Sequence, residues 1–170
     1  MIAIDPPVLE AVVAAAEASY PDEACGLLVG RWSAAGHCRL RRAVPSANLA
    51  PDPSVAFEID PALRLDLQRR LRGGGQRVVG LYHSHPDGPA RPSARDLARA
   101  WEPGLLWLIT SVPAGKAVLS GVHLVEHRDG RHAFREMPLR TSEGAPARTA
   151  TDPPGPGRDA PVGSAAWGEE

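Results

Sequence analysis

Cysteine is scarce in this chain, which has only Cys25 and Cys38 among 170 residues. If the two lie on a hairpin that turns near residues 33–36, Cys38 faces about Arg31, six residues beyond Cys25. At ~3.3 Å per strand residue the two thiols are then roughly 20 Å apart, far beyond the reach of a disulfide. We therefore expect two reduced thiols, as is usual for a cytoplasmic protein.

An excess of charge of one sign and long hydrophobic runs are also missing. The 19 basic and 20 acidic residues leave a net charge of −1, without the excess of basic residues typical of nucleic-acid binding. No uninterrupted apolar run approaches the ~20 residues that span a bilayer. The start of the chain carries Asp5, Glu10 and Glu17 and no basic region, so we do not expect a signal peptide. The composition thus predicts no nucleic-acid partner and no membrane partner.

Apolar residues become sparse after Arg140. Residues 141–170 are rich in Gly, Pro, Ala, Thr and Ser and include a PPGP run at 153–156. Such a segment cannot bury enough apolar surface to offset the entropy lost on ordering it. We therefore expect one domain over residues 1–140, followed by a Pro/Gly-rich disordered tail over 141–170.

The first part of the chain contains helical patterns interleaved with strand patterns. Apolar residues repeat at helical spacing from Leu9 to Ala16, and Asp5 can cap this helix while Pro21 stops it. Helices interleaved with strands predict an α/β domain. Further helices are predicted over 61–72 and 93–100, and strands over 24–31, 38–44, 56–59, 77–85, 105–111, 116–125 and 131–137.

The most informative stretch is His83-Ser84-His85, followed by Asp96. Alternate residues of a strand share one face, so His83 and His85 should point the same way and Ser84 the opposite way. Two neutral imidazoles and one carboxylate make an open zinc site, with the fourth position left to water. Taken singly, these residues also have ordinary explanations: surface histidines, and a helix N-terminal box formed by Ser93 and Asp96. Only their combination favours metal-dependent hydrolysis.

That combination extends upstream and downstream of the histidines. The upstream segment PDEACGLLVG contains Glu23, and seven residues separate His85 from the Ser93-x-x-Asp96 motif. An upstream glutamate, His-Ser/Thr-His, a gap of this length that usually opens with proline, and Ser-x-x-Asp are the signature of the JAMM (MPN-plus) zinc metallopeptidases. The chain closely resembles this family over about residues 5–140, and every motif position is filled.

The resemblance implies the JAMM/MPN fold, which is similar to that of cytidine deaminases: a single α/β domain with a curved mixed β-sheet flanked by helices. It also implies one Zn²⁺ per chain, with His83, His85 and Asp96 as ligands. Glu23 would act on the zinc-bound water as general base and then as general acid to the leaving amine. Ser93 would hold the tetrahedral oxyanion.

Some alternatives stay open beside this assignment. Asp87 could serve as a substitute ligand, although the resemblance selects the later aspartate. Asn48 and Phe57 stand where family members often carry these residue types, which is a weaker supporting match. Members of the superfamily that have lost their ligands serve as protein-binding subunits, so a non-catalytic zinc-binding MPN scaffold is a further alternative. The presence of Glu23 and Ser93 argues against that role here.

The resemblance also implies a substrate. The family acts beside the flexible C-terminal Gly-Gly of ubiquitin-like proteins, and this chain looks like its compact bacterial members, which process sulfur-carrier proteins of the ThiS/MoaD type. We therefore expect a cytoplasmic zinc peptidase that cleaves after the Gly-Gly of such a carrier. The alternative is an isopeptidase that releases ubiquitin-like proteins from lysines. Dimers occur among relatives, so a homodimer stays open.

Overall fold

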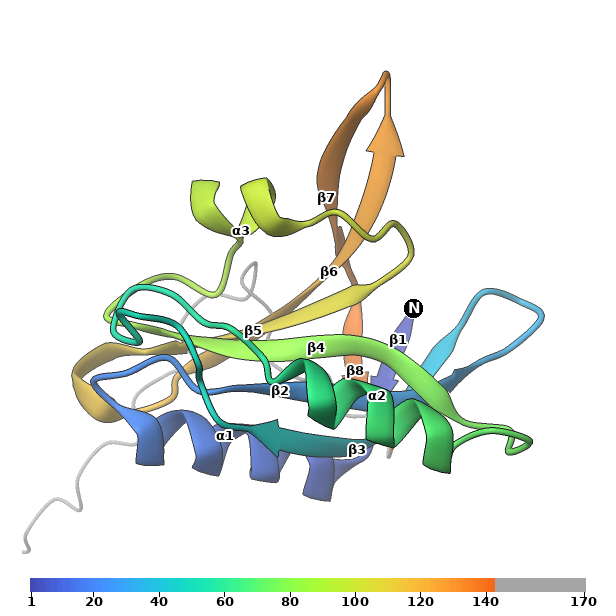
Figure 1. Cartoon of the computed structure of the whole chain (residues 1–170), viewed down its shortest axis with the longest axis horizontal. Helices are drawn as coiled ribbons and strands as arrows, with labels where there is room; N and C mark the ends of the chain where they lie inside the picture. The colour runs from blue at the N-terminus through green and yellow to red at the C-terminus, as the bar shows by residue number, and fades with distance from the viewer. Residues whose placement is uncertain (143–170) are drawn as a thin grey trace, which may run out of the picture.

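The computed structural model describes residues 1–142, which fold around one eight-stranded sheet (Figure 1). The strand order is β7-β6-β5-β4-β2-β3-β1-β8. No helix in this described part is long and apolar enough to cross a membrane. The strands are β1 (Ile2–Ile4), β2 (Cys25–Trp32), β3 (Cys38–Ser46), β4 (Arg77–Pro86), β5 (Leu106–Val112), β6 (Leu119–Arg128), β7 (Arg131–Met137) and β8 (Leu139–Thr141). The helices are α1 (Pro6–Ser19), α2 (Pro61–Arg70) and α3 (Ala94–Arg99), with a short 3-10 turn at Pro113–Gly115.

The sheet is mixed, with parallel pairs at its centre and near one edge. β4 runs parallel to β5 and antiparallel to β2. β1 runs parallel to both β3 and β8, and the remaining neighbours are antiparallel. α3 lies in the connection from β4 to β5, as the crossover between parallel strands requires. The predicted α/β fold, a curved mixed sheet flanked by helices, is confirmed (Figure 1).

Helices cover both faces of the sheet, because its central strands are apolar on both sides. Leu28 of β2 belongs to one core cluster with Val8 and Val12 of α1. The adjacent Leu27 points to the other face, where it belongs to a cluster with Leu67 of α2. β4 and β5 are buried along most of their length, so they form a firm base for side chains that project from them.

The sequence does not predict the short strands β1 and β8. Each has three residues, and their pairing depends on partners distant in the chain: Ile2 pairs with both Cys38 and Leu139. β8 continues to Thr141, which is the first residue of the predicted tail. The rest of that tail, from residue 143, lies outside the described residues.

Local interactions override two further expectations. The strand predicted over 56–59 is wrong, because this segment is a loop apart from one isolated bridge to Asn48. Asp5 precedes α1 as predicted, but its carboxylate does not cap the helix. Prolines fill the first helical positions and offer no N–H, and the carboxylate instead pairs with Arg39 and Arg41 at 2.8 and 3.4 Å. The other predicted helices and strands are present, with shifted ends.

A glycine allows β4 and β5 to lie close together. A Cβ atom at Gly80 would lie 2.3 Å from the Leu106 carbonyl oxygen and 2.8 Å from the Leu106 Cβ. We expect Gly80→Ala to lower the free energy of unfolding by about 1–3 kcal/mol, the usual cost of overpacking. Urea denaturation followed by circular dichroism measures this. An unchanged unfolding midpoint would contradict the close packing of the two strands.

Candidate active site

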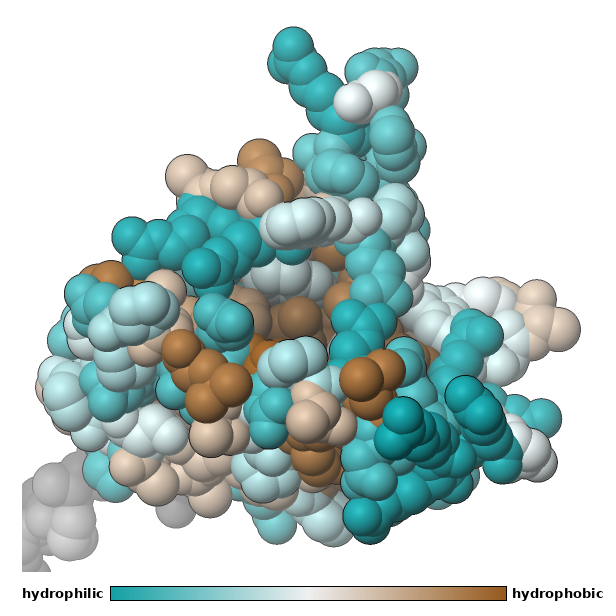
Figure 2. Space-filling view, in the orientation of Figure 1, coloured by the Kyte–Doolittle hydropathy of each residue, from teal (hydrophilic) through white to brown (hydrophobic). Residues whose placement is uncertain are grey.

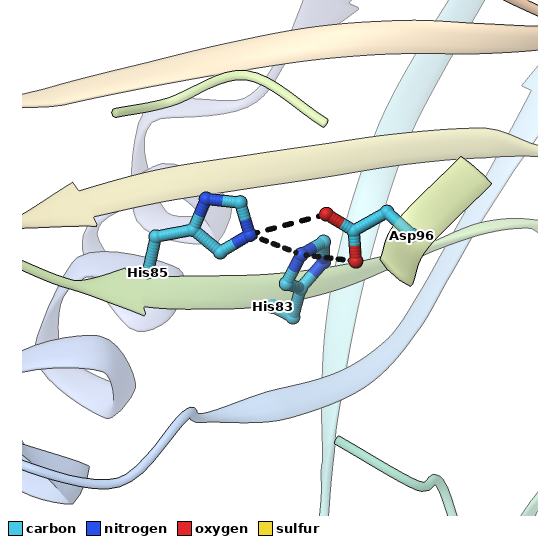
Figure 3. A group of neighbouring side chains, drawn as sticks. All are labelled: His83, His85 and Asp96. Atoms are coloured by element: carbon cyan, nitrogen blue, oxygen red, sulfur yellow. Dashed lines mark hydrogen bonds and ion pairs between the residues drawn. The ribbon is translucent and has the colours of Figure 1, made fainter. Parts of the chain in front are cut away.

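Strand β4 presents two histidines on one side of the sheet. His83 is completely buried and His85 nearly so, and their Nε2 atoms lie 3.0 Å apart. Ser84, between them, does not join the pair, because its Oγ accepts a hydrogen bond from the Ala24 N–H at 2.8 Å. The predicted alternation is confirmed, and it places two imidazole nitrogens side by side (Figure 3).

Asp96 reaches this pair from the first turn of α3 (Figure 3). Its Oδ1 lies 3.3 Å from the His83 Nε2, and its Oδ2 lies 3.3 Å from the His85 Nε2. A capping box fixes the carboxylate. The Ser93 N–H donates to Asp96 Oδ2 at 2.6 Å, and the Asp96 N–H donates to Ser93 Oγ at 3.1 Å. One motif thus caps the helix and brings the carboxylate to the histidines.

The three side chains fit a zinc ion. Donor atoms about 2.0–2.1 Å from a tetrahedral zinc lie about 3.3 Å from one another. The two Nε2 atoms are 3.0 Å apart, and each lies 3.3 Å from a different oxygen of the Asp96 carboxylate. With one ligand atom taken from each residue, the three atoms lie within 4.8 Å of one another. The His85 Nδ1–H donates to the Pro89 carbonyl at 2.8 Å, so the Nε2 of the neutral ring faces the cluster with its lone pair, and that of the protonated ring can donate to Asp96. Two imidazoles and one carboxylate are also the donor set of an open zinc site.

Burial and hydrogen bonding set the charges of the cluster. Burial opposes the charged form of Asp96, but hydrogen bonds from His83 and His85 outweigh it and hold the Asp96 pKa well below its usual range. Complete burial lowers the pKa of His83, which favours the neutral imidazole that binds metals. Burial opposes charge on His85 as well, but its hydrogen bonds to Asp96 and Pro89 raise its pKa.

Aromatic rings hold the His83 imidazole in place. Phe57 stacks on it with ring centroids 4.3 Å apart, and Trp107 meets it edge-on at 5.6 Å. The His83 Nδ1 has no hydrogen-bond partner within residues 1–142. The orientation of this ring therefore depends on packing, whereas that of His85 depends on a hydrogen bond. No motif in the sequence identifies Trp107.

Glu23 lies just before β2, beside the histidine strand. Cys25 pairs with His83, and continuing that register places Glu23 opposite His85. Glu23 is 8% exposed, and its burial raises the pKa to about 7, although the nearby His85 opposes the rise. Among the described residues, the ligand atoms of His83, His85 and Asp96 lie within 4.8 Å of one another, and Glu23 is not part of this group. It therefore adjoins the cluster without joining it.

Asn48 fixes the backbone of Glu23. Its Nδ2 donates to the carbonyl oxygens of Glu23 and Ala56 at 3.0 and 2.9 Å. Its Oδ1 accepts from the N–H groups of Ala50 and Glu58, each at 3.0 Å. Both donor hydrogens and both acceptor positions of the amide are thus accounted for. Asn48 is a clamp that joins the glutamate segment to the neighbouring loop.

Two other residues have structural partners. Asp87 accepts hydrogen bonds from the Tyr20 hydroxyl at 3.0 Å and the Ala114 N–H at 2.8 Å, and it does not take part in the ligand cluster. His123 is buried on β6. Its Nε2–H donates to the Ala90 carbonyl at 3.3 Å. No ligand spacing in the sequence points to His123.

We expect Asn48→Ala to lower the free energy of unfolding by about 1–3 kcal/mol, because it leaves the carbonyl and N–H groups of the clamp without their partner. Urea denaturation measures the loss. Asn48→Asp, which keeps the acceptor oxygen, should retain part of the stability. Ser54→Ala, an exposed change in the same loop, is the matched control. Equal losses from Asn48→Ala and the control would contradict the clamp.

Known proteins resemble the chain over the region that contains this site. Residues 5–123 match the family described as prokaryotic homologs of the JAB domain. A desampylase from Haloferax volcanii is 37% identical over 117 residues, which cover 69% of this chain and 76% of that protein. A CysO-cysteine peptidase from Mycobacterium tuberculosis is 33% identical over 103 residues, 61% of this chain and 68% of the peptidase.

A solved structure shows the same fold. The solution structure of a protein from Desulfitobacterium hafniense aligns with a TM-score of 0.68 and 34% identity, covering 84% of this chain and 94% of that one. The family match contains Glu23, both histidines of β4, Ser93 and Asp96. The chain therefore belongs to the prokaryotic homologs of the JAB domain and is a hydrolase of the JAMM type, as its motif predicts.

Proposed function

We propose that the chain is a zinc metallopeptidase that hydrolyses the peptide bond after the C-terminal Gly-Gly of a ubiquitin-like sulfur-carrier protein of the ThiS/MoaD type. The observation that carries this proposal is the cluster of His83, His85 and Asp96 with Glu23 opposite His85. The relationship to a CysO-cysteine peptidase supports a peptide bond on such a carrier as the substrate.

His83, His85 and Asp96 would hold one Zn²⁺ per chain. Zinc bound there would lower the pKa of a water to about 7 and polarise a carbonyl oxygen. Glu23 adjoins the ligands without being one of them, so its carboxylate is free to take a proton from the attacking water. The same carboxylate then protonates the leaving amine. Asn48 supports this role, because its Nδ2 donates to the backbone carbonyl oxygen of Glu23 at 3.0 Å and so fixes the backbone there.

Ser93 is suited to bind the oxyanion of the reaction. Its Oγ accepts a hydrogen bond from the Asp96 N–H, and the hydroxyl hydrogen remains available to donate. Ser93 is exposed beside a buried ligand, so a substrate can reach it. One such donor typically contributes about 10²–10³ in rate.

A groove beside the cluster suits an extended chain end. A hollow of about 290 Å³ lies between α2 and α3, and Phe57, Leu81 and Trp107 contribute to its walls together with Arg64 and Arg99. Figure 2 shows hydrophobic surface in this recess. Since Phe57 and Trp107 also contact His83, the groove adjoins the ligands. A flexible Gly-Gly end has no bulky side chains and can extend its backbone, so it suits such a groove.

Isopeptide hydrolysis is the second candidate. The relationship to a desampylase favours it, because that class of relative cleaves conjugates of ubiquitin-like proteins. Both reactions break the amide bond that follows Gly-Gly, and both can use the same five side chains. They differ only in whether the leaving amine is a backbone nitrogen or a lysine Nζ.

Metal analysis tests the ligands without any substrate. We expect one zinc ion per chain, and His85→Ala should abolish stoichiometric binding because it removes one of three ligands. Zinc at a hundred times its Kd should stabilise the fold by about 2.7 kcal/mol, seen as a rise in Tm that a chelator reverses. His37→Ala, a change at an exposed histidine, is the control. Zinc retained in full by His85→Ala would contradict the assignment.

Intact-mass analysis of sulfur carriers tests the reaction. One set of carriers is extended by a few residues past Gly-Gly, and a second set is joined through Gly-Gly to a lysine. We expect zinc-loaded wild-type protein to cleave the first set after Gly-Gly. Glu23→Gln should keep its zinc and lose about 10²–10⁴ in rate, the usual contribution of a general base.

Glu10→Gln, a change at an exposed carboxylate of α1, is the matched control and should cleave as the wild type does. Cleavage of the lysine-linked set alone would favour the isopeptidase. If zinc is bound and neither set is cleaved by the wild type, the proposed reaction is wrong and a binding scaffold takes its place.

A further inference from the structure

The ligand loop, residues 86–92, joins the histidine strand to the capping box and has no role assigned so far. Three of its consecutive carbonyl groups each accept a hydrogen bond from a side chain, and the three donors stand on β5, β4 and β6. Bonds of this kind fix a loop that has no regular structure of its own. The bonds are Ser111 Oγ to Gly88 O at 2.6 Å, His85 Nδ1 to Pro89 O at 2.8 Å and His123 Nε2 to Ala90 O at 3.3 Å.

The bond from His123 is buried and closely fitted. His123 is 4% exposed and Ala90 is 1% exposed, so water does not compete for the bond. Gly121 lies two residues earlier on β6, and a Cβ atom there would be 2.6 Å from the Ala90 carbonyl oxygen and 3.2 Å from the His123 Nε2. The strand thus has a glycine where the ligand loop crosses it and a donor beside that crossing.

His123 is not a fourth ligand. Its Nε2 is engaged by the Ala90 carbonyl. Among the described residues, the side chains that gather their ligand atoms in one place are His83, His85 and Asp96. Burial also lowers the pKa of His123, which agrees with a neutral imidazole that donates through Nε2. Its chemistry is therefore directed at the loop.

We propose that His123 is a positioning residue of the metal site, which with Ser111 fixes the ligand loop so that Asp96 meets the histidines of β4. α3 has only six residues, and its C-terminal end is tied down by the Arg99 side chain, which donates to the Phe57 carbonyl at 2.5 Å. The N-terminal end, where Asp96 lies, is held by the exposed Arg95 side chain, which donates to the Val55 carbonyl, and by the ligand loop that leads directly into the capping box. This inference rests on the zinc site of the proposed function.

Three variants separate positioning from ordinary core packing. His123→Leu removes the donor and keeps an apolar side chain, whereas His123→Gln keeps an N–H donor near the position of Nε2. The control is Ser120→Ala on β6, the strand of His123; it removes a buried hydrogen bond of 2.9 Å to Thr110 on β5. Ser120 alternates with His123 and lies on the other face, away from the ligand loop.

The first readout is the zinc Kd, measured without substrate by competition with a chromogenic chelator, alongside the Tm of the zinc-free protein. We expect His123→Leu to raise the Kd about tenfold, the lower end of losses seen for outer hydrogen bonds of metal sites, and His123→Gln to restore most of it. Ser120→Ala should lower the Tm and leave the Kd unchanged. On a cleavable carrier, His123→Leu should lower kcat and leave KM unchanged.

If His123→Leu and Ser120→Ala lower the Tm alike and neither changes the zinc Kd, His123 is a core residue and the inference is wrong. If His123→Leu does not fold, Ser111→Ala takes its place, because it deletes a single oxygen from the other anchor of the loop; an unchanged Kd then overturns the inference. Zinc binding with the expected shifts but without carrier cleavage would contradict the proposed substrate and leave the positioning role standing.

Discussion

The antiparallel register between β2 and β4 is the constraint on which the site depends. Ala24 and Ser84 are bonded twice: the Ser84 N–H donates to the Ala24 carbonyl at 3.0 Å, and the Ala24 N–H donates to the Ser84 Oγ at 2.8 Å. A slip of one residue would turn both histidines toward the opposite, apolar face. The hydroxyl between the two histidines therefore holds the strand in the register that brings Glu23 opposite His85.

The remaining parts of the site are attached to this pair of strands from two sides. On one side Asn48 ties the Glu23 carbonyl to the loop that contains Phe57, whose ring packs on His83. On the other side the capping box of α3 delivers Asp96. Arg99 connects the two sides, because its guanidinium donates to the Phe57 carbonyl oxygen. The helix that positions Asp96 and the loop that packs on His83 therefore support each other.

Part of the cluster could be predicted from the sequence because its geometry is local. A strand alternates its side chains and a capping box has fixed spacing, which accounts for the shared side of His83 and His85 and for the bonds between Ser93 and Asp96. The choice of Asp96 over Asp87 came from the family resemblance. The place of Glu23 depends on pairing between distant strands, and only the family resemblance supplied it. His123 had no such signal, since a single histidine in an alternating strand looks the same whether its bond partner is water or a loop carbonyl.

The errors in the fold have the same origin. β1 and β8 are too short to show a pattern, and they form because each finds a partner far along the chain. The segment 56–59 has the residues of a strand, but Asn48 accepts and donates the hydrogen bonds that a neighbouring strand would otherwise make. Side-chain bonds to backbone groups thus decide the local structure where propensity alone gives the wrong answer.

The residues proposed to hold the metal and the proposed general base come from separate parts of the chain. His83, His85 and Asp96 lie within one short stretch, whereas Glu23 arrives on another strand. The stretch proposed to hold the metal is complete without that carboxylate, so the two proposed properties can be inherited and lost independently. With Glu23 as the proposed general base, a single codon change at position 23 would leave a lineage with the same sheet and side-chain cluster but no turnover. From this fold, a descendant that only binds its partner is one evolutionary step away.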